Sequence, residues 1–127
     1  MAHPEPEYRE RIDELAARAA HDRATFEPPE NPPDEERAMA FLREGLGPLV
    51  VLYLDARTAD RDIAFSGDEL AQFHRATNDW LALYARCYGV AMEPDATIRK
   101  AAEVLIQTDD IQATAQLLTQ VPPRPTG

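Results

Sequence analysis

The three histidines and the single cysteine are the side chains most able to bind a metal or act as a nucleophile. His3 lies in a proline-rich end, and His21 stands beside Asp22 without a second histidine at helical spacing. His74 has no acidic residue three or four positions away. A metal centre needs several such ligands that converge, so the spacing predicts no metal site and no bound cofactor.

Nucleophilic and phosphate chemistry find no better support. Cys87 is the only cysteine, so no internal disulfide can form. As a nucleophile it would need a histidine base beside it, and no spacing in the sequence predicts one. The segment Gly45-Leu46-Gly47-Pro48 lacks the later glycine and the lysine of a phosphate-binding loop. The sequence therefore predicts a protein that is not an enzyme.

Three glutamines near the C-terminus offer a different chemistry. Gln112, Gln116 and Gln120 recur every four residues, and glutamine side chains can pair with adenine edges in the major groove. Two short helices over residues 95–121 would then form a helix-turn-helix unit, with the last helix as the reader. That last helix has no arginine or lysine for phosphates, which supply most of the affinity for nucleic acid. DNA binding is the alternative function, and a solvated polar face is the structural interpretation.

An aromatic stripe gives the main functional hypothesis. Trp80, Tyr84 and Tyr88 recur every four residues, and Phe73 and His74 come one or two helical turns earlier. Large amphipathic rings suit either a core or an interface. Other apolar residues of the same segment already supply an inner face, so we expect one edge of this stripe to contact a protein partner or a second copy of the chain. For the stripe as a whole the core is the favoured interpretation, and contact with a partner through this one edge is the functional hypothesis.

The charge balance indicates where the protein works. The 127 residues include 23 Asp and Glu against 13 basic residues, a net charge of −10, and Lys100 is the only lysine. Such a surface repels itself in dilute buffer, but in multimolar salt the Debye length falls to about 3 Å and the repulsion is screened. The composition therefore indicates a cytoplasmic protein of a halophile. A nucleic-acid partner is disfavoured by the lack of arginine and lysine in the last helix and less by the acidity, because a halophile's DNA-binding proteins are acidic as well.

No targeting or membrane signal stands out. The N-terminus lacks the basic start and apolar stretch of a secretory signal. The longest apolar run, Leu49 to Leu54, is far shorter than the roughly 20 residues of a membrane-spanning helix. We expect a protein that does not act at a membrane.

Apolar residues spaced three and four apart predict an all-α fold, a bundle of four to five helices. We expect a single domain over residues 1–127, with flexible ends at 1–6 and 122–127. The first helix covers residues 7–26. The proline-rich elbow at 27–33 then excludes helix, because proline lacks the amide donor and restricts the residue before it.

The second helix carries a proline in its interior. Apolar residues over 39–56 keep the three-four alternation through Pro48, which predicts one long helix bent at this proline. Gly45 and Gly47 leave room for the bend. The alternative is an α+β fold with a short hairpin at 49–65, because periodicity alone does not separate a short apolar strand from a helix.

The sharpest local signal is a helix start. Ser66 and Glu69 have the spacing of a capping box, and Phe65 and Leu70 that of a hydrophobic staple. The central helix of the fold therefore begins at this point, and Gly89 supplies its left-handed stop.

Two shorter helices complete the expected fold. Pro94-Asp95 restarts the chain into a fourth helix that extends to about Gln107. Thr108-Asp109 then caps a fifth, short helix that ends near Val121. The alternative DNA-binding function uses these two helices.

Three segments carry a resemblance to a known family: Pro48–Thr58, Phe65-Ser66 and Trp80–Gly89. They resemble small acidic proteins of halophilic archaea that are grouped as a family of unknown function. The resemblance implies habitat and compactness, and it carries over no catalytic residue. We expect a non-enzymatic protein-interaction or assembly subunit, with a helix-turn-helix DNA-binding protein as the alternative.

Overall fold

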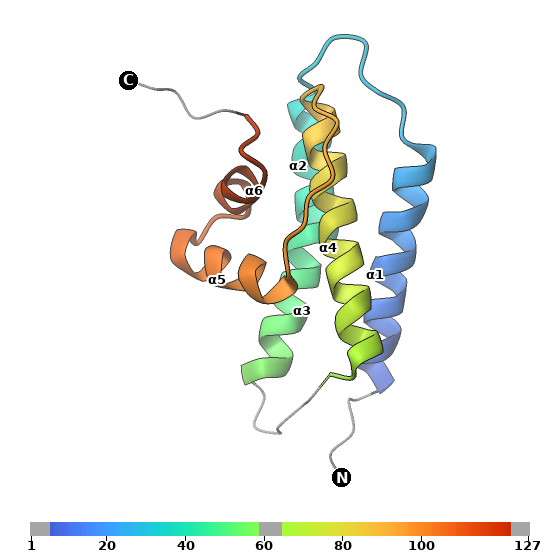
Figure 1. Ribbon diagram of the computed structural model, residues 1–127, viewed down its shortest axis with the longest axis vertical. Helices are drawn as coiled ribbons and strands as arrows, with labels where there is room; N and C mark the ends of the chain where they lie inside the picture. Colours follow the sequence, from blue (N-terminus) through green and yellow to red (C-terminus); the bar gives the residue numbers. More distant parts are fainter. Residues whose placement is uncertain (1–5, 59–64, 123–127) are drawn as a thin grey trace.

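The computed structural model describes residues 6–58 and 65–122. The described chain is entirely helical outside its loops, which confirms the all-α prediction. Because α2, η1 and α3 follow one another without a break, the described residues form five continuous helices. Figure 1 shows how these helices are arranged. Apart from positions 6 and 122, the ends expected to be flexible lie outside the described residues. The elements are α1 (Pro6–Thr25), α2 (Glu35–Phe41), η1 (Leu42–Leu46), α3 (Gly47–Thr58), α4 (Gly67–Cys87), α5 (Ile98–Thr108) and α6 (Ile111–Thr119).

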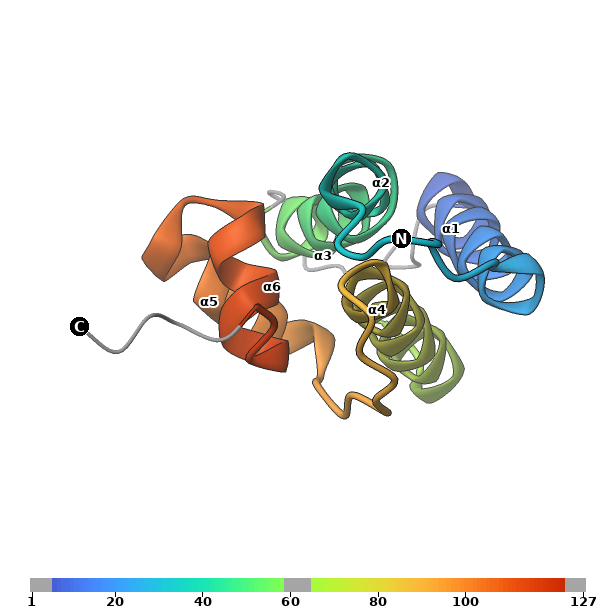
Figure 2. The ribbon, with the colours of Figure 1, turned by 90° about the horizontal axis from the view of Figure 1, so that it is seen from above.

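Helix α4 lies at the centre of the arrangement. Figures 1 and 2 show α1, α4 and the continuous α2–α3 helix side by side, with α5 and α6 on the side away from α1. Helix α4 contacts α1, α2, α5 and α6. As a result, every residue from 76 to 85 is buried. The buried stretch includes the polar residues Thr77, Asn78 and Asp79 as well as apolar ones, so its burial reflects the central position of α4.

The outer helix α1 presents the apolar stripe that its sequence predicts. Ile12, Leu15 and Ala19 are almost fully buried, and α1 packs mainly against α4. The elbow then leads back to the end of α4, where the amide of Asp34 donates to the carbonyl of Cys87 at 2.7 Å. The Asp34 side chain accepts from the amide of Arg37 and thereby caps α2.

The second predicted helix is continuous, but its irregularity precedes the proline. The amide of Gly47 donates to the carbonyl of Leu42, five residues earlier, which closes a π-helical turn. Pro48 has no amide to offer the carbonyl of Glu44, and its ring would clash with that carbonyl in a regular α-helix. The wider turn of η1 accommodates the proline without a break in the helix.

The alternative with a hairpin at 49–65 is wrong. Residues 49–58 are helical, and Leu49, Val50 and Tyr53 belong to the hydrophobic core. The turn that this hairpin needed falls at positions 59–64, outside the described residues.

The π-helical turn lies against Trp80. A Cβ atom built on Gly45 would lie 2.5 Å from Cε2 and 2.6 Å from Cε3 of Trp80, and closer still to Cδ2. Carbon atoms in favourable contact are about 3.5–4.0 Å apart, so no side chain fits at this position. The Trp80 indole is almost fully buried, and the centroid of the Phe41 ring lies 6.0 Å from the centroid of the indole. Glycine at position 45 thus sets how closely η1 approaches α4.

The capping box predicted for α4 is confirmed. The Ser66 hydroxyl accepts from the amide of Glu69 at 3.1 Å, and the Glu69 carboxylate accepts from the amide of Ser66 at 2.8 Å. The other oxygen of the buried Glu69 carboxylate lies 3.7 Å from the Arg9 side chain of α1. At the other end of α4, Gly89 adopts φ +83°, the left-handed conformation expected of the stop.

Two helix starts differ from the sequence prediction. Helix α5 begins at Ile98, three residues after the predicted restart, because Thr97 caps it by accepting the amide of Lys100. Helix α6 is capped by Asp110, whereas the prediction placed the cap at Thr108-Asp109. In both cases a neighbouring residue with an equally suitable side-chain oxygen makes the cap.

We predict that Gly45→Ala lowers the free energy of unfolding by about 1–3 kcal/mol, because the added methyl group must displace the buried indole. Gly67→Ala is the matched control: it lies in the first turn of α4, and a Cβ there meets nothing within 4 Å. Urea unfolding at fixed salt should show the control to be as stable as the wild type or more so. A Gly45→Ala protein of unchanged stability would contradict the close contact with Trp80.

Candidate binding site

The structure separates the five residues of the predicted partner-contact edge. Phe73, Trp80 and Tyr84 are almost fully buried, so the prediction is wrong for these three. The physical reason is the central position of α4, whose middle turns have neighbouring helices on all sides and no face toward solvent. His74 and Tyr88 are partly exposed, and their contact with a partner stays a prediction.

The two tyrosines of this stripe tie α4 to other parts of the chain. The Tyr84 hydroxyl donates to the carbonyl of Val121 at 2.7 Å, and burial raises the pKa of Tyr84. The Tyr88 hydroxyl donates to the Glu35 carboxylate at 3.2 Å, and burial followed by this hydrogen bond raises the pKa of Tyr88. Burial also raises the pKa of the Cys87 thiol, which therefore stays protonated at neutral pH.

The three glutamines of the DNA-binding alternative do not share one helix face. Gln112 is exposed on α6. The Gln116 amide donates to the carbonyl of Pro122 at 2.9 Å. Gln120 follows the end of α6 in a left-handed conformation and donates back to the carbonyl of Leu117. Of the three glutamines, only Gln112 is thus both exposed on the helix and without a hydrogen bond from its side chain to the main chain.

A cavity of about 500 Å³ opens between α3, α4 and α5. Pockets that bind small ligands in proteins measure roughly 300–1,000 Å³ and combine apolar walls with a few polar groups. The lining comes from α3, from the first turns of α4 and from the start of α5, in that order: Tyr53, Arg57, Phe65, Leu70, His74, Thr97, Ile98 and Arg99.

The apolar part of the lining is aromatic and supported from the core. The rings of Tyr53 and Phe65 stack with centroids 6.2 Å apart. Phe73 meets Tyr53 edge-on at 5.8 Å and Phe65 edge-on at 4.9 Å, so it fixes both lining rings although it does not line the cavity itself. Leu70, which the sequence predicts as half of a hydrophobic staple, is 43% exposed at the edge of the cavity.

The polar part of the lining is basic. The Arg57 guanidinium lies 5.8 Å from the ring centroid of Tyr53. His74 Nε2 lies 3.2 Å from a carboxylate oxygen of Asp95, and Arg99 Nε lies 3.4 Å from one of Glu103. None of the described lining residues is acidic, although the chain carries a net charge of −10. The described lining thus carries two arginines and a histidine but no carboxylate of its own.

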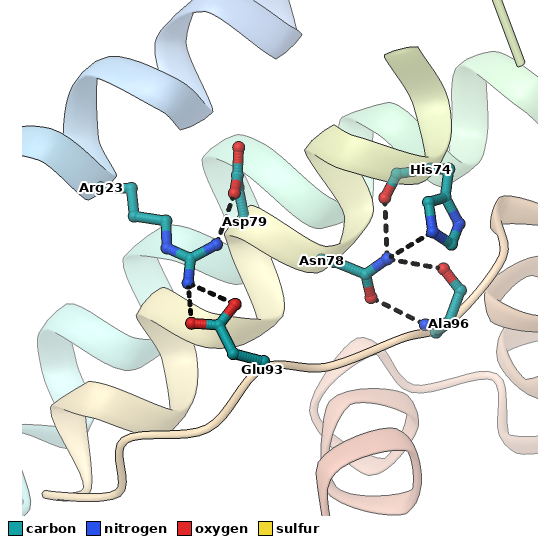
Figure 3. Close-up of polar contacts among 6 residues, drawn as sticks. All are labelled: Arg23, His74, Asn78, Asp79, Glu93 and Ala96. Atoms are coloured by element: carbon teal, nitrogen blue, oxygen red, sulfur yellow. Dashed lines mark hydrogen bonds and ion pairs between the residues drawn. The ribbon is translucent and has the colours of Figure 1, made fainter. Parts of the chain in front are cut away.

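Asn78 positions the wall that α5 contributes (Figure 3). Its side-chain amide donates to the carbonyl of Ala96 at 3.0 Å and accepts from the amide of Ala96 at 2.8 Å. The same side chain also donates to the carbonyl of His74 at 2.9 Å. These bonds hold the segment 90–97 along α4, so that Thr97 starts α5 beside the cavity.

A second polar cluster in Figure 3 attaches the same segment to α1. The Arg23 side chain donates to Asp79 at 2.8 Å and to Glu93 at 2.7 Å. The hydrogen bond from Arg23 lowers the pKa of the exposed Glu93. Arg23 thereby connects α1, α4 and the 90–97 segment, and it supports the wall of the cavity from outside.

Sequence reasoning found His74 among the lining residues but missed the cavity. One signal was available, because Tyr53 and Arg57 are four apart and share a helix face. Leu70 was assigned to a staple, and Arg99 to no role. The cavity forms where three helices pack against one another, and the spacing of residues within one helix does not predict how separate helices pack.

The described lining carries few groups of the kinds that act as nucleophiles or metal ligands. It contains no serine or cysteine nucleophile, and the Thr97 hydroxyl is occupied as a helix cap. Within residues 6–58 and 65–122 no group of three His, Cys, Asp or Glu side chains could hold a metal ion. In the same part of the chain no helix combines the length and apolarity that a bilayer span requires.

A family model described as a domain of unknown function (DUF8055) matches residues 6–123. The match extends over all the helices from α1 to α6. No curated protein and no solved structure matches the chain. Because the family model covers most of the chain, the protein belongs to the DUF8055 family.

Proposed function

We propose that the protein is a non-enzymatic interaction domain that binds another protein at the cavity between α3, α4 and α5. The observation that carries the proposal is the combination of aromatic lining and an exposed apolar edge. Tyr53 and Phe65 form an apolar surface, and the neighbouring Leu70 is 43% exposed. The residues that contribute most to binding in protein interfaces are anchors that fill well-packed apolar pockets of this kind.

One apolar side chain of a partner would fill only part of this cavity, since a cavity of about 150 Å³ already holds a benzene-sized ring. Burial of a leucine or phenylalanine side chain contributes about 1.5–3 kcal/mol. Interfaces gain most of their free energy from a few such anchors that fill pockets, with less sensitive contacts around them. The aromatic lining is fixed by Phe73 from the core, so little conformational entropy would be lost on binding.

The structure supports the other function classes less well. The lining offers no nucleophile for an enzyme, as described above. For DNA binding, Asp109 and Asp110 directly precede α6 and would face phosphates with negative charge. Gln116 is also engaged with the main chain of Pro122.

We also infer that the domain works in a salt-rich cytoplasm. The net charge of −10 comes with a single lysine, and half of the described ion pairs join two exposed side chains. Exposed pairs contribute little to stability, so they do not offset the repulsion among 23 acidic residues in dilute buffer.

We predict that the melting temperature rises as potassium chloride increases from dilute to molar concentration, because the salt screens this repulsion. Sucrose, which stabilises folded proteins without screening charge, is the control. A melting temperature that is flat or falls across the salt series would contradict the inferred habitat.

Site-specific crosslinking tests the binding function. We predict that a photoreactive phenylalanine at Leu70 forms a covalent adduct with one discrete protein in living cells. The same group at Val51 is the control, because Val51 is 57% exposed and does not line the cavity. Adducts should be absent or scattered at Val51. No adduct at Leu70, or the same adducts at both positions, would contradict binding at the cavity.

A further inference from the structure

Among the described residues, the basic side chains of the cavity are only partly paired: Arg99 lies near Glu103 and His74 near Asp95, each partner exposed. Arg57 comes from α3 and Arg99 from α5, and His74 lies on α4 between them in sequence. Arg57 has no ion-pair partner among the described residues. Two independent helices thus bring a guanidinium to the same aromatic cavity.

From this arrangement, and resting on the proposed function, we infer that the cavity selects an acidic segment of the partner protein. In such a segment an apolar anchor side chain fills the aromatic part, and an adjacent Asp or Glu carboxylate binds Arg57 and Arg99. Arginine suits this role because its planar guanidinium can donate two parallel hydrogen bonds to one carboxylate.

The carboxylates already near these basic groups do not fill the role. Glu103 pairs with Arg99 from one turn later on the same helix, and Asp95 pairs with His74. Their side chains are 50% and 86% exposed, and neither residue lines the cavity. A ligand carboxylate can therefore join the cluster without breaking a buried ion pair.

The start of α5 adds to the same preference. The Thr97 hydroxyl accepts a hydrogen bond from the amide of Lys100. The helix dipole places partial positive charge at this end of α5, and the first residues of the helix, Ile98 and Arg99, line the cavity. The partial positive charge at the helix end attracts an anion only weakly by itself, but it acts in the same direction as the charge of the arginines. The start of α5 and the arginine that it carries therefore favour an anion together.

The overall acidity of the chain is compatible with an acidic partner in high salt. Repulsion between two acidic surfaces extends over about one Debye length, and in molar salt the Debye length is about 3 Å. Direct contact between a carboxylate and a guanidinium is weakened much less by salt than this longer-range repulsion. A local basic cavity would then set the orientation in which two acidic proteins meet.

Short capped peptides test the inference directly. The probes are acetyl-Phe-Glu-amide, its isosteric uncharged form acetyl-Phe-Gln-amide, and the basic acetyl-Phe-Lys-amide. Binding is followed in molar potassium chloride by NMR shifts of Phe65 and Ile98, which line the cavity. We expect the Glu peptide to bind about fivefold more tightly than the Gln peptide, and the Lys peptide to bind most weakly.

Matched variants identify the group responsible. Arg57→Met should bring the affinity for the Glu peptide close to that for the Gln peptide. Arg43→Met removes the same charge from an exposed residue of η1 outside the cavity and should leave the fivefold preference unchanged. Melting curves of both variants verify that the fold is retained.

Equal binding of the Glu and Gln peptides, or a preference for the Lys peptide, would overturn the inference. The absence of any shift at Phe65 and Ile98 would overturn it as well. Neither result would remove the proposed function as long as Leu70 still crosslinks to a discrete protein. Loss of that crosslink, in contrast, is the outcome that contradicts the function itself.

Discussion

The contact between the Trp80 indole and the backbone of Gly45 is the constraint on which the rest of the structure depends. Trp80 is buried, and its Nε1 has no hydrogen-bond partner among the described residues, so packing alone fixes its position. The contact brings η1 directly against α4, and the wide turn then lets the helix continue through Pro48. Helix α3 follows, and it delivers Tyr53 to the cavity.

The third wall of the cavity depends on polar contacts made within the same stretch of α4. Asn78, two residues before Trp80, binds both backbone groups of Ala96. A side chain that pairs with main-chain groups in this way leaves neither partner unsatisfied in the interior, which would cost about 1–3 kcal/mol per group. One buried segment of α4 therefore positions α3 through packing and α5 through hydrogen bonds.

The local features of the fold could be predicted from the sequence, because they depend on neighbours within one helix. The buried stripe of α1 and the Ser66 cap are of this kind. The aromatic stripe favours a core position for Trp80 and Tyr84, but that neither ring keeps an edge open to a partner depends on α1, α2, α5 and α6 surrounding α4. The cavity was missed for the same reason: Tyr53 and Arg99 are far apart in sequence and meet only after the helices have packed.

A double-mutant cycle between positions 45 and 80 tests the central claim most directly. It compares the loss of unfolding free energy caused by Gly45→Ala in the wild type with the loss in a Trp80→Leu background, measured by urea unfolding in molar potassium chloride. If the indole is what excludes a side chain at position 45, the smaller leucine should remove most of that loss. The same loss in both backgrounds would show that the two residues do not constrain each other.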